Sequence, residues 1–220
     1  MTSTRALIPI VAAVMILGLA GMLRAGDVAT RSAPPTVDEE DQANIVAADE
    51  RAKFFPGPKS ESLLGQTFTT GNAPGGYLLK GFSLQVDKAS TPEVPERVYT
   101  IRAVKVSGND TRELAKADGL IQTGPWSDDD WFTWTFDKPV ELLPNMLYGV
   151  DVTMTKAGNW QLGLPYMLFT KSDTFRGGCL YHRSKADPEA IKPDANADRV
   201  IHVDLEENDP VPPGTLIYRD

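Results

Sequence analysis

The eleven residues from Trp126 to Phe136, WSDDDWFTWTF, combine three carboxylates with three tryptophans and two phenylalanines. Sugar-binding sites use this mixture, because the flat C–H faces of a sugar stack on exposed rings while carboxylates accept hydrogen bonds from its hydroxyl groups. The turn KAGNWQLG adds a further indole. On this hypothesis the candidate ligand-binding residues are Trp126, Asp128, Asp130, Trp131 and Trp160. The alternative is a polar turn, with rings that pack under the loops.

The second half of this stretch has the pattern of a half-buried β-strand. Alternate side chains of a strand face opposite sides of the sheet, and three large rings share one side: Phe132, Trp134 and Phe136. Thr133 and Thr135 fall on the other side, with Trp131. Burial of one such ring contributes about 1.5–3 kcal/mol. We therefore predict that Trp134 lies in the core and that only the leading edge of the stretch is left for a site.

The rest of the body also alternates with a period of two, which predicts strands rather than helices. The segments are 78–87, 96–107, 147–155 and 198–206, and clusters of Gly, Pro, Asn and Asp separate them. In the first segment we expect Leu78, Phe82, Leu84 and Val86 to share the buried face. Val150 and Val203 should also be buried. The pattern predicts an all-β fold, an antiparallel β-sandwich of jelly-roll type, with a closed β-barrel as the alternative.

Charge and cysteine content exclude several classes of function. The net charge is −8, and without residues 1–25 the chain has 20 basic and 30 acidic residues, so phosphate backbones would repel it and no nucleic-acid partner is expected. The single cysteine, Cys179, excludes an intramolecular disulfide and a Cys-rich zinc site. With only His182 and His202, a multi-histidine metal centre cannot form. We expect Cys179 to be structural and assign no catalytic, cofactor-binding or metal-binding residue.

The N-terminus has the order of a secretory signal peptide. Arg5 precedes an apolar run over residues 6–23, and Leu23-Arg24-Ala25 offers a cleavage site. We therefore predict export, to the periplasm, the cell surface or the medium, with residues 1–25 acting as a signal peptide. The alternative is an uncleaved anchor, in which residues 6–23 tether the protein to a membrane.

The remaining chain divides into a leader and a body. Residues 26–60 are polar and acidic, and Thr36 with Glu39 fits a capping box, which predicts a short helix in this leader. Residues 61–220 are expected to form a single β-sandwich domain. Oxygen-rich loops such as SDDD and EENDP have the ligands that Ca²⁺ takes, so a structural calcium is left open, although no loop has EF-hand spacing.

Three phrases resemble a known bacterial family. GQTFTTGNAPGGYLLKGFSLQV, WTFDKPVELLPNMLYGVDVTM and SDTFRGGCLYHRS with DRVIHVDLE are similar to the opening, middle and closing strands of exported "choice-of-anchor" β-sandwich domains. The resemblance covers residues 65–205. It implies a secreted or surface-displayed, non-catalytic jelly roll that is comparable with carbohydrate-binding modules.

Three functions stay open at this point. The first is an exported, non-catalytic binding or surface-assembly module whose partner is a glycan or an envelope or matrix protein. The second is a structural component of the envelope without a small ligand. The third, which we disfavour, is a glycoside hydrolase, because that chemistry needs only two suitably spaced carboxylates.

The first prediction concerns export. A fusion of residues 1–35 to a reporter enzyme should leave the cytosol, because the apolar run after Arg5 is what the secretion machinery recognises. Fractionation of the expressing cells gives the readout, and a reporter retained in the cytosol would contradict the prediction. The intact mass of the mature protein then decides between cleavage near Ala25 and an uncleaved anchor.

Overall fold

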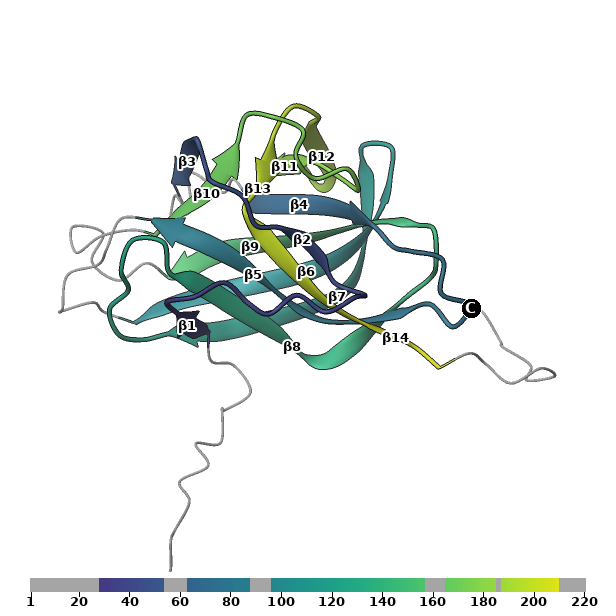
Figure 1. Ribbon diagram of the computed structural model, residues 1–220, viewed down its shortest axis with the longest axis horizontal. Coiled ribbons are helices and arrows are strands. Elements are labelled where there is room, and N and C mark those ends of the chain that lie inside the picture. Colours follow the sequence, from purple (N-terminus) through teal and green to yellow (C-terminus); the bar gives the residue numbers. More distant parts are fainter. Residues whose placement is uncertain (1–27, 54–62, 88–95, 157–164, 185–186, 210–220) are drawn as a thin grey trace, which may run out of the picture.

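The computed structural model describes residues 28–53, 63–87, 96–156, 165–184 and 187–209, and every regular element in these ranges is a β-strand. The strands pair antiparallel in two sheets that pack against each other (Figure 1). The predicted antiparallel β-sandwich is therefore confirmed. No helix in the described ranges is long and apolar enough to cross a membrane, and the predicted signal segment, residues 1–25, lies outside them.

The first sheet is built around one long strand, β5. Strand β8 pairs with one edge of β5, while β14 and β10 share the other edge. Short strands complete the sheet: β1 pairs with β8, β2 with β14, and both β3 and β13 with β10. The bounds are β1 (Ala29–Arg31), β2 (Gln42–Asn44), β3 (Glu50–Lys53), β5 (Tyr77–Asp87), β8 (Trp131–Leu142), β10 (Tyr166–Thr170), β13 (Asp198–Arg199) and β14 (Ile201–Glu207).

The second sheet pairs in the order β12, β11, β4, β9, β6, β7. A single residue pair, Ala190 with Asp110, also joins β12 to β7, so the pairing path returns to its start and the sheet is strongly curled. The bounds are β4 (Leu63–Thr69), β6 (Arg97–Ser107), β7 (Asp110–Gln122), β9 (Leu147–Lys156), β11 (Leu180–Ser184) and β12 (Asp187–Asp194).

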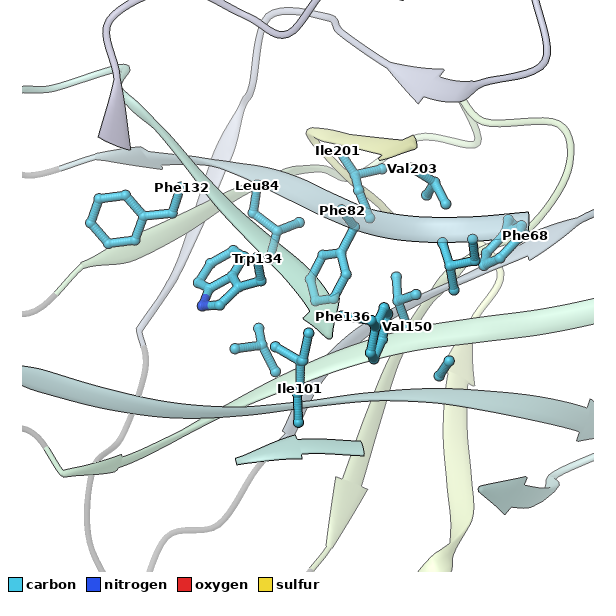
Figure 2. Close-up of a cluster of buried hydrophobic side chains, with 14 of the residues drawn as sticks. Phe68, Phe82, Leu84, Ile101, Phe132, Trp134, Phe136, Val150, Ile201 and Val203 are labelled. Carbon is cyan, nitrogen blue, oxygen red and sulfur yellow. The ribbon is translucent and has the colours of Figure 1, made fainter. Parts of the chain in front are cut away.

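Trp134 lies at the centre of the core between the sheets (Figure 2). Its indole stacks on Phe82 of β5 and meets the edge of Tyr99 of β6, with ring centroids 5.5 Å apart in both pairs. Trp134 is 0% exposed, as predicted. The other residues predicted to be buried are confirmed as well: Phe82, Leu84, Val150 and Val203. The alternation in the sequence therefore identified the faces that build this core.

One face assignment in β5 was wrong. The sequence pattern placed Leu78 on the same face as Phe82, but Leu79 is the buried residue and Leu78 is only partly buried. The pairing of β5 with β8 shifts register between Leu79 and Gly81, so a β-bulge near Lys80 reverses the alternation. An inserted residue of this kind leaves no mark in a period-two pattern.

The short helix predicted in the leader is also wrong, because residues 28–53 contain β1, β2 and β3 instead. Asp41 fixes this segment on the first sheet: its carboxylate accepts a hydrogen bond from the Leu205 backbone N–H at 2.8 Å and contacts Nε2 of His202 at 2.7 Å. Pairing with sheet edges satisfies the backbone of the leader better than an isolated helix would, since short helices are marginal without packing.

The second prediction tests the core. Trp134→Ala should lower the free energy of unfolding by about 3–5 kcal/mol, because it removes a fully buried indole and leaves a cavity. Urea denaturation followed by circular dichroism measures the change. Thr135→Ala, on the exposed face of the same strand, is the control and should change stability by about 0.5 kcal/mol or less. A loss below about 1 kcal/mol for Trp134→Ala would contradict the assigned packing.

Candidate functional site

The two tryptophans at the leading edge of WSDDDWFTWTF are buried. Trp126 is 3% and Trp131 is 1% exposed, so the expectation that these rings are open to solvent is corrected. Trp126 meets the edge of Phe132 at 5.5 Å, and the Arg97 guanidinium lies over its ring at 4.6 Å. Trp131 packs with Leu168 and Val200 in a small cluster of its own. Both rings are therefore packed inside the protein, one on each side of the turn formed by residues 127–130.

The aspartates between these rings form a tight turn against β5. The carboxylate of Asp130 is buried and accepts a hydrogen bond from the Ser127 backbone N–H at 2.8 Å. The backbone of Val86 donates to the Asp130 carbonyl at 2.7 Å and accepts from the Asp129 N–H at 2.9 Å. Asp129 has a positive φ of 68°, a conformation that aspartate tolerates better than most residues. The Asp130 carboxylate therefore stabilises the turn and is not open to a ligand.

Asp128 lines a cleft of about 570 Å³ beside this turn. Five carboxylates from separate segments contribute to the lining: Asp49, Glu50, Asp87, Asp128 and Asp129. Apolar side chains complete it: Val46, Ala47, Ala48 and Leu168, with Gln85 between the two groups. We call this the acidic cleft. It joins the leader, β5 and the turn before β8, which are far apart in the sequence.

One cation contacts two of these carboxylates. Lys171 pairs through Nζ with Glu50, and its backbone N–H donates to Asp49 at 2.9 Å. The pKa of Lys171 is raised, first by its hydrogen bond to Glu50. Within the parts of the chain that the structure describes, no group of three or more Asp, Glu, His or Cys side chains is arranged to hold a metal ion. Trp160, the remaining predicted site residue, lies outside the described residues.

A second pocket, of about 520 Å³, lies on the other side of β10 and was not anticipated from the sequence. Its lining includes Phe169, Lys171, His182, Asp194, Asn196 and Arg199. We call this the Arg199 pocket. Arg199 is the second residue of the segment DRVIHVDLE, whose alternation describes the later residues and carries no signal for a buried cation. Sequence reasoning had no means of finding it.

The curled second sheet encloses a polar cluster around Asp151. The alternation of β9 placed Asp151 on the face opposite Val150, yet it is 0% exposed, because both faces of this strand are covered. Arg102 donates to both carboxylate oxygens, at 3.0 and 3.2 Å, and the Tyr181 hydroxyl donates at 2.9 Å. A Cβ at Gly65 would lie 2.2 Å from the Tyr181 ring, so the tyrosine reaches Asp151 only across a glycine. The buried Arg183 also faces Asp151, with its Nη2 4.0 Å from the carboxylate, so these contacts tie three strands to one carboxylate.

The cysteine chemistry fits a structural thiol. Cys179 is half-buried, with Sγ 3.7 Å from the Thr67 hydroxyl, and burial raises the pKa of its thiol. A catalytic cysteine needs the opposite shift, since the thiolate is the nucleophile. Burial and the nearby Arg199 lower the pKa of His182, so this histidine is neutral near pH 7.

No protein-family model and no curated protein matches the chain, so the resemblance to choice-of-anchor domains stays a prediction. One similar solved structure contains the cysteine protease and lectin-like domains of Cwp84, a surface-layer-associated protein of Clostridium difficile, with 9% identity, a TM-score of 0.40, and coverage of 65% of this chain and 32% of that one. A second, the clostridial Cwp84 protease after propeptide cleavage, has 9% identity, a TM-score of 0.48, and coverage of 79% and 42%. The match thus spans less than half of either protease chain, and at these TM-scores it carries no functional argument.

The third prediction tests the polar cluster. Asp151→Ala should destabilise the protein by about 3–5 kcal/mol, because it leaves the partly buried Arg102 and the buried Arg183 without their carboxylate. Urea denaturation gives the value. Glu113→Ala is the matched control: Glu113 is exposed and lies 3.9 Å from Arg102, so its removal should cost about 1 kcal/mol or less. Equal losses in the two variants would show that Asp151 is not the centre of the cluster.

Proposed function

We propose that this protein is an exported, non-catalytic binding module that takes a hydroxyl-rich ligand, such as a glycan, in the acidic cleft. The observation that carries the proposal is the cleft itself, where carboxylates and apolar side chains line one concave surface beside Asp128. Carboxylates accept hydrogen bonds from sugar hydroxyls, while apolar side chains contact sugar C–H groups.

The charge of the cleft selects among ligands. Five carboxylates converge on the cleft, and Lys171 contacts two of them, Asp49 and Glu50. The body of the protein is acidic as well, so an anionic ligand would be repelled. The ligand best suited to this surface is therefore neutral or cationic, and a neutral glycan satisfies the description.

The rings of the opening stretch support this proposal indirectly. Trp126 and Trp131 lie beneath the turn that presents Asp128, so they fix the position of the carboxylate without touching the ligand. A site on a loop binds well when rigid neighbours hold its side chains in place. Substitution of either tryptophan would disturb the fold and would therefore not report on binding alone.

The fourth prediction tests the cleft. In a glycan array and in calorimetric titration of each hit, Asp128→Ala should weaken binding at least about tenfold, because it removes a charged acceptor that contributes about 1.5–3 kcal/mol. Asp137→Ala is the matched control, since Asp137 is also exposed but lies on β8 outside the cleft.

Each other result contradicts a stated part of the proposal. Unchanged affinity in Asp128→Ala would remove the cleft as the site. Release of a cleaved sugar would contradict the non-catalytic assignment. Binding to envelope protein with no glycan hit would favour the structural role instead.

A further inference from the structure

Arg199 is a buried cation for which the described residues supply no hydrogen-bond acceptor. The residue is 0% exposed, and Nε, Nη1 and Nη2 all lack a hydrogen-bond partner in the ranges that the structure describes. Arginine carries five N–H donors and buried polar groups are nearly always hydrogen-bonded, so a guanidinium with three unsatisfied nitrogens is exceptional. Its guanidinium carbon lies over the Phe169 ring, 5.4 Å from the ring centroid.

The neighbouring carboxylate does not neutralise this charge. Asp198 precedes Arg199 in the chain, but its carboxylate accepts hydrogen bonds from Nε2 of Gln66 and from the backbone N–H groups of Thr174 and Phe175, each at 2.9 Å. These three donors come from β4 and from residues 174–175, and they hold the Asp198 carboxylate in place. The carboxylate next to Arg199 in the chain is therefore hydrogen-bonded to other groups.

The backbone of Arg199 is fixed on both sides. Its N–H donates to Oε1 of Gln66 at 2.8 Å, and its carbonyl accepts from Nδ2 of Asn44 at 2.8 Å. Strand β13 also pairs Arg199 with Phe169 of β10. These backbone contacts fix the position from which the guanidinium extends. Binding residues are preorganised in this way.

Burial lowers the pKa of Arg199 to about 9, which still leaves the side chain mostly protonated near neutral pH. No opposing contribution from a carboxylate accompanies that shift. An unpaired buried charge is strongly unfavourable, and an anion placed beside it would restore the missing interaction.

The surroundings of Arg199 provide room for such an anion. The Arg199 pocket measures about 520 Å³, which is within the range of small-molecule sites. Phe169 lines it, and His182 lies close enough to Arg199 for the guanidinium charge to lower its pKa. Further donors on the lining come from Lys171 and Asn196, which are exposed.

We propose that the Arg199 pocket binds an oxyanion group, a carboxylate, sulfate or phosphate, carried by a small ligand. The planar guanidinium matches two oxygens of such a group, and Lys171, whose ammonium pairs with Glu50, lies at the rim. Asp194, the one carboxylate in the lining, suits hydroxyl groups on the rest of the ligand. This site is separate from the acidic cleft, and its charge selects the opposite kind of ligand.

Thermal unfolding and calorimetric titration of the full-length protein test this site. The probes are sodium acetate, sulfate, phosphate and glucuronate, each compared with sodium chloride at equal ionic strength, and glucose is the neutral partner of glucuronate. At least one oxyanion should raise the Tm and bind with measurable heat, whereas glucose should not compete with it. The order among the four probes identifies which oxyanion group the pocket prefers.

Three variants locate the binding. Arg199→Met should weaken the oxyanion at least about tenfold and raise the Tm measured in chloride, because it removes an uncompensated buried charge. Asn196→Asp places a negative charge on the exposed rim and should weaken binding without affecting the core. Arg112→Met, an exposed arginine on β7 away from the pocket, is the control and should bind as the wild type does.

The proposal is overturned if no probe raises the Tm above the chloride value. It is equally overturned if Arg199→Met and Asn196→Asp both bind the oxyanion as the wild type does. Asp128→Ala should retain oxyanion binding, and loss of binding in that variant would place the anion elsewhere. Because Asp128 lies outside the Arg199 pocket, failure of glycan binding in the acidic cleft leaves this test unaffected.

Discussion

The packing of Trp134 against rings from both sheets is the contact on which the architecture depends. Phe82 comes from β5 and Tyr99 from β6, so one indole fixes the relative position of the two sheets. Phe132 continues the contact toward the start of β8, with centroids 6.0 Å from Trp134, and Trp126 packs on Phe132. A continuous run of aromatic rings therefore connects the centre of the core to the turn that carries Asp128. The turn beside the acidic cleft is therefore packed against the same aromatic core that holds the two sheets together.

Strand β10 then separates two regions of opposite charge. Successive side chains of a strand face opposite sides: Leu168 lines the acidic cleft and Phe169 lines the Arg199 pocket. The ion pair of Lys171 with Glu50 lies between them, since Lys171 lines one pocket and Glu50 the other. Carboxylates exposed at the acidic cleft remain solvated, whereas the cation of Arg199 is buried. Water therefore stabilises the exposed carboxylates of the acidic cleft, and an anion would have to stabilise the charge of Arg199.

The curl of the second sheet explains how Asp151, an outward-facing residue of β9, comes to be buried. Asp151 would face solvent on a flat sheet, but β11 folds over β4 and brings Tyr181 onto it. Gly65 permits that approach, because any larger residue would meet the tyrosine ring. Arg102 neutralises the carboxylate from the adjacent strand β6. The buried Asp151 thus has a cationic partner, in contrast to Arg199, which the described residues leave unneutralised.

The sequence by itself determined the fold class and the core faces, because a period of two in apolar residues directly reports which side of a strand avoids water. Trp134, Val150 and Val203 were identified in this way and are buried. The leader was misread because a capping box is a local signal, whereas pairing at the sheet edge is decided by residues such as Asp41 that meet distant strands. Tertiary structure alone decided what meets each outward-facing side chain. Leu168 of β10 packs on Trp131, and Tyr181 of β11 bonds to Asp151. Arg199 has no neutralising partner among the described residues. The alternation of apolar and polar residues predicts which side chains face outward from a strand. Whether such a side chain then meets water or protein depends on segments that are remote in the chain.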